Sequence, residues 1–228
     1  MVDDIRVLLD RLRAETFVTI GWSGGGPHAL ACAALLPERC AAAATLAGVA
    51  PYTADGLRWL EGMTPENVEE FSRALEGESA LAPWLEQEAA KLAGVTGGEV
   101  AAALGGLVSA VDQAVLTGEF AKYIASCFRR AVSTGIAGWR DDNLAFTRNW
   151  GFDVSRIERP VAVWQGGEDR MVPFAHGQWL ADHIPGAHAH LDPRQGHLTL
   201  AVTALKQIVD ELLELARDVG SASGAESA

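Results

Sequence analysis

Residues 20–31 of the chain read IGWSGGGPHALA, and this stretch decides the fold. An apolar, β-rich run at 17–21 leads into it, and an alanine-rich run typical of a helix follows at 27–36. Between them, residues 21–25 (GWSGG) fit the pattern G-x-S-x-G. In that pattern a sharp turn from strand to helix strains the serine backbone and exposes the hydroxyl, while small neighbours let strand and helix pack closely. The stretch therefore predicts that Ser23 is a nucleophile at the end of a strand.

Other interpretations of the same glycines are weaker. A plain strand–helix turn with an incidental serine stays open for the pentapeptide alone. Gly24, Gly26 and Ala29 also fit the looser dinucleotide pattern GxGxxA. That pattern needs an acidic residue at the end of the next strand to hold ribose hydroxyls, and residues 46–48 there read LAG. No GK[ST] follows the glycines, so the stretch is not a P-loop.

A serine hydroxyl needs a histidine to take its proton, and the histidine needs a carboxylate to orient it. Asp169 follows a predicted strand at 160–165, and His197 stands between a last strand and the final helix. Loops at the ends of parallel strands meet at one rim of a sheet, and the order serine, acid, histidine is known for such a fold. We therefore predict Ser23, Asp169 and His197 as the catalytic residues.

The chain offers rivals for the two partner roles. Glu168 directly precedes Asp169, and Asp192 is nearer to His197 in sequence but lies in an Asp-Pro turn. Both stay open as the acid. Among six histidines, His197 is the one preceded by a glycine. We expect His28, early in the helix after the serine, to be structural.

The coarse pattern is α/β with an all-helical middle. Strands are predicted at 17–21, 41–47, 160–165 and 187–191. Between 51 and 151 no strand pattern is convincing, and helices are predicted at 65–75, 85–92, 99–115, 120–132 and 143–150. We expect a core made of 1–50 and 152–218, a helical cap at 51–151 and a disordered tail at 219–228.

With these motifs in place, the chain resembles the α/β-hydrolase superfamily, in particular its lidded esterase and peptidase-like members. The similarity rests on GWSGG, on LAGVAP after the next strand, on WGFDVSRIERPVAVWQGGEDRMVP around Asp169, and on IPGAHAHLDPRQGHL around His197. The resemblance implies a mostly parallel sheet with an inserted cap. It also implies Ser23 as nucleophile, Asp169 as orienting acid, His197 as general base and the Gly24 N–H as one oxyanion donor. Trp22, beside the nucleophile, is a candidate wall of the substrate pocket.

The chain departs from this family upstream of the serine. Family members carry several strands and an HG-containing loop before the nucleophile, and that loop supplies the second oxyanion donor. Here one predicted helix and a short connection precede Ser23, without an HG pair. We therefore expect an N-terminally incomplete hydrolase fold in which 17–21 forms an uncovered apolar edge, a hazard for aggregation. The alternatives are a second copy or chain that completes the sheet, giving a homo-oligomer, and a scaffold that has lost catalysis.

Composition limits the remaining possibilities for the partners and the location of the protein. A formal charge of −12 disfavours nucleic acid as a partner, because such affinity depends on Lys and Arg at phosphates. There is no signal-peptide pattern and no apolar run of membrane-spanning length, and three scattered cysteines favour a cytoplasmic location. We expect no metal and no cofactor.

The predicted reaction is hydrolysis of a small ester, amide or thioester, and the alternative is a non-catalytic interaction module. Cap aromatics that are candidates for lining the pocket are Trp59, Trp84, Phe120, Tyr123, Phe128, Trp139, Phe146 and Trp150.

Overall fold

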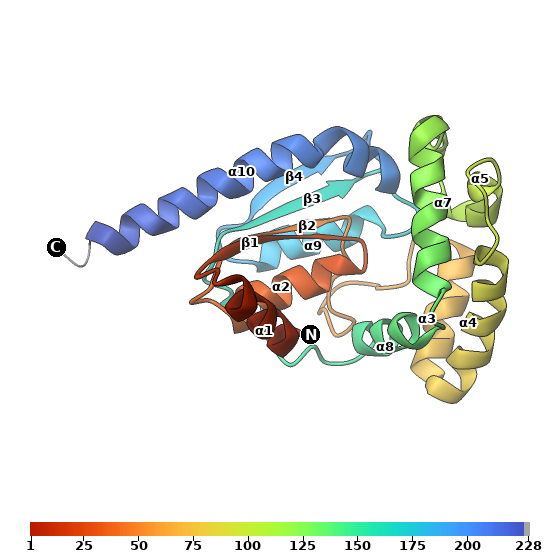
Figure 1. Ribbon diagram of the computed structural model, residues 1–228, viewed down its shortest axis with the longest axis horizontal. Coiled ribbons are helices and arrows are strands. Elements are labelled where there is room, and N and C mark those ends of the chain that lie inside the picture. Colours follow the sequence, from red (N-terminus) through yellow and green to blue (C-terminus); the bar gives the residue numbers. More distant parts are fainter. Residues whose placement is uncertain (226–228) are drawn as a thin grey trace.

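The computed structural model describes residues 1–225 and contains one four-stranded parallel sheet in the order β1-β2-β3-β4 (Figure 1). The strands are β1 (Phe17–Trp22), β2 (Cys40–Leu46), β3 (Val161–Gly166) and β4 (His188–Asp192). Each strand pairs in parallel with the next. The prediction of an α/β fold with a parallel sheet and an inserted helical region is confirmed, and all four strands lie close to where the sequence predicts them.

Helices cover both faces of this sheet. On one face lie α2 (Gly25–Leu35) and α9 (Phe174–His183), with α1 (Val2–Leu12) beside α2; on the other lies α10 (His197–Ala225) (Figure 1). Successive side chains of a strand point to opposite faces. Accordingly Ala43 packs in the cluster with α2 and α9, whereas Ala42 and Ala44 pack in the cluster with α10. Ala42, Ala43 and Ala44 are fully buried, and their small side chains suit a central strand sandwiched between helices.

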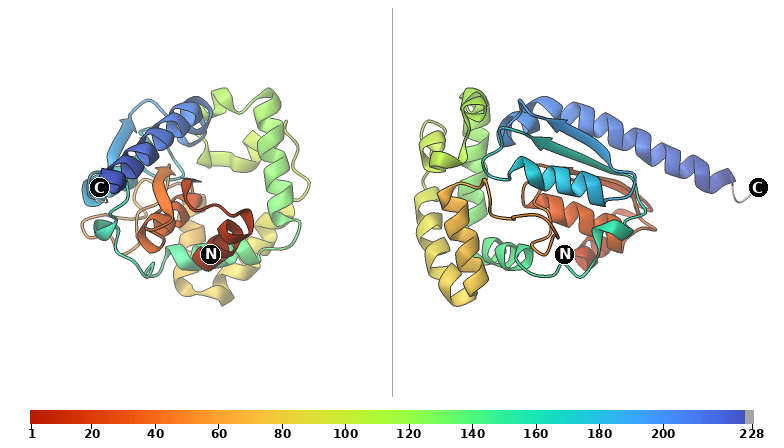
Figure 2. Two further views of the ribbon diagram at one scale, coloured as in Figure 1. Left: turned by 60° about the vertical axis from the view of Figure 1, so that its left-hand side comes forward. Right: turned by 180° about the vertical axis from the view of Figure 1, so that it is seen from behind.

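The middle of the chain forms a layer of helices across the end to which the strands point (Figures 1 and 2). Its α-helices are α3 (Pro65–Glu76), α4 (Glu78–Leu92), α5 (Val100–Leu104), α6 (Ala110–Val115), α7 (Gly118–Val132) and α8 (Ala137–Phe146). We call residues 51–151 the cap; as a domain boundary this division stays a prediction.

Three predicted helices have different bounds in the structure. The helix predicted at 99–115 is broken into α5, a 3₁₀ turn at Gly105–Leu107 and α6. Gly105 there adopts a φ of +54°, a conformation that an α-helix interior does not contain. The helix predicted at 85–92 begins earlier, at Glu78, and the one predicted at 143–150 runs instead from Ala137 to Phe146.

The predicted tail at 219–228 also differs in its boundary. Helix α10 continues to Ala225, because extending an existing helix is far easier than starting one. Residues 226–228 lie outside the described part of the chain.

Strand β1 lies at one edge of the sheet, as the sequence predicts for 17–21. Ile20 on β1 is 37% exposed, and Val7, Leu8 and Leu12 on α1 are each more than half exposed. This side of the molecule therefore presents apolar side chains beside the free edge of β1, whose other edge pairs with β2. Within residues 1–225, no helix combines the length and the apolar character that crossing a membrane requires.

Candidate active site

The G-x-S-x-G stretch forms a tight turn between β1 and α2. Ser23 has a φ of +54°, one of few non-glycine residues in the left-handed region. Its backbone N–H donates to the Leu46 carbonyl at 2.8 Å, and its carbonyl accepts from the Gly26 N–H at 2.9 Å. These bonds tie the strained residue to the neighbouring strand and to the start of the helix.

Two glycines of the stretch are required by close packing. A Cβ at Gly21 would collide with the backbone carbonyl of Gly25, and a Cβ at Gly26 would lie 2.8 Å from the Cα of Gly48. A Cβ at Gly25, by contrast, would meet nothing within 4 Å. Gly24 is the N-cap residue of α2, so its amide lies at the positive end of that helix.

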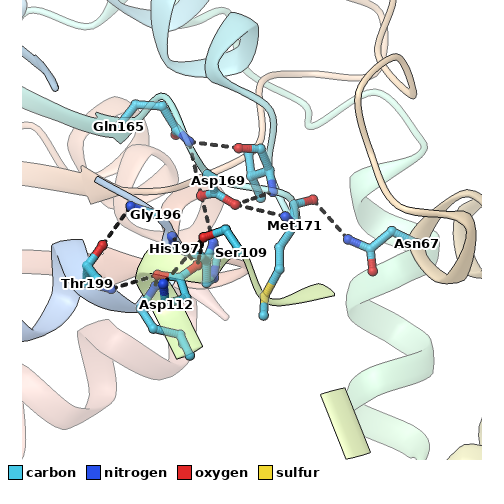
Figure 3. Close-up of polar contacts among 11 residues, drawn as sticks. Asn67, Ser109, Asp112, Gln165, Asp169, Met171, Gly196, His197 and Thr199 are labelled. Atoms are coloured by element: carbon cyan, nitrogen blue, oxygen red, sulfur yellow. Dashed lines mark hydrogen bonds and ion pairs between the residues drawn. The ribbon is translucent and has the colours of Figure 1, made fainter. Parts of the chain in front are cut away.

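His197 and Asp169 meet across the rim of the sheet (Figure 3). The Nδ1 atom of His197 lies 2.8 Å from Oδ2 of Asp169, and both side chains are buried. The carboxylate oxygen Oδ1 accepts from the backbone N–H groups of Met171 at 2.8 Å and Val172 at 2.9 Å. Asp169 is therefore held by its own loop in a position to accept a hydrogen bond from the Nδ1–H of His197, which leaves Nε2 of His197 as the basic nitrogen.

Gln165 completes the support of this carboxylate. Its side-chain Nε2 donates to Oδ2 of Asp169 at 3.1 Å and to the Val172 carbonyl at 2.8 Å, and the side chain is fully buried. The sequence pattern gives no signal for this role, since Gln165 lies in an otherwise apolar strand.

Charge controls the protonation of His197. Burial alone would lower its pKa, but the Asp169 carboxylate, the hydrogen bond to it and the charge of Asp112 together raise the pKa above its ordinary value. A histidine of this kind is a stronger base than a free imidazole.

The rival residues lie elsewhere. Glu168 is exposed, and Asp192 accepts from the backbone and side chain of Arg194 within its own turn. The Nε2 atom of His28 lies 3.0 Å from the Asp142 carboxylate, and His28 is absent from the residues that line the cavity described next. Of the acids considered, Asp169 is the one that contacts His197.

Ser23 and His197 line one cavity of about 920 Å³ between the sheet rim and the cap. Trp22 lines it too, and its ring centroid lies 5.6 Å from that of His197. Four of the eight aromatics predicted to line a pocket do so: Trp84, Tyr123, Phe128 and Trp139. Trp59 and Phe146 instead belong to a buried apolar cluster. Trp150 and Phe120 pack against other apolar clusters and are not among the residues that line the cavity.

The cap side of the cavity is acidic. It is lined by Glu66, Glu69, Glu70 and Glu88, with Lys91 as the basic residue among them. Burial raises the pKa of Glu70 even though Trp139 and Asn143 donate to its carboxylate at 2.6 and 2.5 Å. Among the residues that the structure describes, no group of three or more His, Cys, Asp or Glu side chains is arranged to hold a metal ion.

Comparison with known proteins shows the family of the chain. Residues 1–202 match the family model described as alpha/beta hydrolase fold. The chain belongs to that family. No curated protein matches the sequence significantly.

Solved structures with the same fold are numerous. The chain resembles a bromoperoxidase from Bacillus anthracis (TM-score 0.64, 19% identity, covering 95% of this chain and 72% of that one). It also resembles a hydrolase from Pseudomonas aeruginosa (TM-score 0.60, 23% identity, covering 93% of this chain and 70% of that one). A third similar structure is an esterase from Exiguobacterium antarcticum (TM-score 0.59, 15% identity, covering 95% of this chain and 72% of that one). At these identities the similarity establishes the fold, and the chemistry of this chain depends on its own site.

Proposed function

We propose that the protein is a serine hydrolase that cleaves a small ester, amide or thioester through an acyl-enzyme on Ser23. The observation that carries the proposal is the buried pair of His197 and Asp169, joined at 2.8 Å, of which His197 lines the same cavity as a serine with left-handed backbone geometry. The fold family, which is a hydrolase fold, supports this assignment.

The first half of the reaction forms the acyl-enzyme. Nε2 of His197 accepts the hydroxyl proton of Ser23 while the serine oxygen bonds to the substrate carbonyl carbon. The Gly24 N–H, at the N-terminus of α2, is proposed to donate to the oxyanion of the tetrahedral intermediate. The intermediate collapses as the bond to the leaving group breaks, and the imidazolium of His197 gives its proton to that group.

The second half repeats these steps with water. Nε2 of His197 takes a proton from water, the hydroxide bonds to the acyl carbon, and the bond to Ser23 breaks as its oxygen regains the proton. Asp169 stays ionised throughout and stabilises the imidazolium. The scheme requires no metal and no organic cofactor.

The cavity indicates the kind of substrate. Its aromatic walls suit an apolar acyl or alcohol part, and its volume suits a small molecule. The surplus of glutamates over lysine in the lining disfavours an anionic substrate. We propose a small neutral substrate and a cytoplasmic site of action.

A matched pair of variants tests the proposal. Purified protein is assayed on p-nitrophenyl esters of increasing acyl length, with aminoacyl anilides and acyl thioesters in parallel. We expect turnover by the wild type and by Ser79→Ala, which removes an exposed serine of α4, and loss of turnover in Ser23→Ala. Equal turnover in Ser23→Ala would remove Ser23 from its role. No turnover by folded wild type on any substrate would favour the alternative, a non-catalytic interaction module.

A further inference from the structure

The first turn of α10 is held by a side chain from the cap. The carboxylate of Asp112 accepts three backbone N–H groups there: that of His197 at 3.0 Å on Oδ2, and those of Leu198 and Thr199 at 2.8 and 2.9 Å on Oδ1 (Figure 3). The first N–H groups of a helix lack partners within the helix, and a residue adjoining the helix normally supplies the acceptor. Here the acceptor comes from α6, 85 residues before His197.

Asp112 is itself fully buried and firmly held. The Ser109 hydroxyl donates to Oδ2 at 3.1 Å and also accepts from the Asp112 backbone N–H at 3.4 Å, as the N-cap of α6. No ion pair joins Asp112 to a lysine or arginine in the described part of the chain. The three amides, the hydroxyl and the positive end of α10 therefore offset its charge.

The glycine that precedes His197 is explained by the same contact. A Cβ at Gly196 would overlap the Asp112 carboxylate. The Gly196 N–H meanwhile donates to the Thr199 hydroxyl at 2.6 Å. A side chain at position 196 would expel Asp112 from the helix start.

We propose that Asp112 is a positioning residue for the general base: its carboxylate fixes the backbone from which His197 projects, while Asp169 fixes the ring. This inference rests on the proposed role of His197. It makes the cap part of the catalytic apparatus, since α6 carries Asp112, and Leu198 next to His197 packs in an apolar cluster with α5 and α7 of the cap.

The charged groups around His197 determine how its pKa should respond when Asp112 is changed. Asp169 approaches from the loop after β3 and Asp112 from α6. Across the cavity lie Glu66, Glu69, Glu70, Glu88 and Lys91. Among these groups, Asp169 and Asp112 contribute to the raised pKa of His197. Removing the charge of Asp112 should therefore lower the pKa of His197 while leaving the contact with Asp169 in place.

Asp112→Asn tests the proposal, because it keeps the size of the side chain and removes its charge. The titration midpoint of the His197 imidazole is followed by NMR, and the rate of covalent labelling by a fluorophosphonate is measured at a pH above that midpoint. We expect a lower midpoint and labelling slowed about tenfold, the scale of one lost hydrogen bond to a charged group. Asp210→Asn, which removes an exposed charge from the same helix, should match the wild type in both. A folded Asp112→Asn protein with unchanged midpoint and rate would overturn the proposal, because a purely structural residue alters stability alone.

A second variant covers the case in which Asp112→Asn does not fold. Ser109→Ala leaves the carboxylate in place and removes the hydroxyl that partly neutralises it. We expect the midpoint of His197 to rise, because the charge of Asp112 is then less compensated, and an unchanged midpoint would overturn the proposal. The titration needs no catalysis. If the wild type resists labelling while the two variants show these shifts in the midpoint, the proposed hydrolase function is refuted. The positioning of His197 by Asp112 then still stands.

Discussion

His197 and Asp169 lie 28 residues apart in the chain, yet Nδ1 of one is 2.8 Å from Oδ2 of the other. Strand pairing explains the approach, because β3 and β4 are parallel neighbours and Gly166 pairs with Asp192 at their ends. The two loops that follow are then joined by hydrogen bonds from Gly167 to the Asp192 carbonyl and from Glu168 to the Gln195 carbonyl. The pairing of the backbone thus places the two loops that carry the acid and the imidazole side by side.

Asp169→Asn should lower activity and shift its pH dependence. In the wild type we expect kcat/KM to fall toward acid with a midpoint above 6.5, since the base must be neutral and its pKa is raised. The variant should lose roughly 10³- to 10⁴-fold in kcat, because the amide no longer orients or stabilises the imidazolium. The midpoint of its residual activity should lie lower. Ester hydrolysis measured from pH 5 to 9 checks both, and an unshifted midpoint in the variant would assign the titration to another group.

Gly21→Ala should destabilise the protein and Gly25→Ala should not, although both glycines belong to the G-x-S-x-G pattern. A Cβ at position 21 meets backbone that cannot move without opening the turn, so we expect a loss of about 3 kcal/mol in the free energy of unfolding. A Cβ at position 25 meets open space at the start of α2, so that variant should be as stable as the wild type. Urea denaturation of the two proteins compares them directly. Equal destabilisation of the two variants would contradict the packing described for the turn, in which a Cβ at position 21 collides with backbone and a Cβ at position 25 does not.

The sequence predicts the sheet well because the residues that mark each strand are adjacent in the chain. Short apolar runs bounded by glycine, proline or charged residues mark β1, β2 and β3, and β4 gives a weaker signal as AHAHL between Gly186 and Asp192. The motif residues Ser23, Asp169 and His197 follow β1, β3 and β4 within a few residues. The broken helix at 99–115 carried a visible signal, the pair Gly105-Gly106, whose low helix propensity favours an interruption.

Other features could not be predicted because they depend on tertiary contacts. The S-x-x-D spacing of Ser109 and Asp112 is typical of a helix start, but nothing local connects Asp112 to a helix that begins 85 residues later. The role of Gln165 likewise depends on a loop that folds back onto its strand. Both residues support the candidate site through buried hydrogen bonds that hydrophobic periodicity does not encode.

His176 should make the protein sensitive to acid. It is fully buried on α9, where Nδ1 accepts from the Ala50 N–H at 3.1 Å and Nε2 donates to the Trp59 carbonyl at 2.9 Å. Burial lowers its pKa to about 4 from an ordinary value of 6.5. Between these two values the unfolded chain binds the proton and the native protein does not, so stability falls as the pH falls through this window.

The expected loss is on the order of 3 kcal/mol between pH 6.5 and pH 4. Urea titrations across this range measure it. His176→Gln should flatten the dependence, whereas His183→Gln, at an exposed position of the same helix, should leave it unchanged. A His176→Gln protein with the full wild-type dependence would contradict the assignment. His197, whose pKa is raised, acts in the opposite sense: its stabilisation is complete below 6.5 and is lost as the pH rises through its native pKa.

Self-association along β1 stays a prediction. The free edge of β1, with Ile20 exposed, is a template for pairing with a second copy. Light scattering should show a concentration-dependent rise in mass for the wild type and for Leu205→Lys, which alters an exposed apolar residue of α10. Ile20→Lys should remain at the monomer mass. Identical behaviour of all three proteins would exclude this edge as the interface.

Mapping of a fluorophosphonate adduct tests the central claim most directly. The folded wild type is treated with the reagent, digested, and the modified residue is identified by mass spectrometry. The account predicts a single adduct on Ser23 that forms faster as His197 loses its proton and is absent from His197→Ala. An adduct on another residue, or a folded wild type that stays unmodified at every pH, would contradict it.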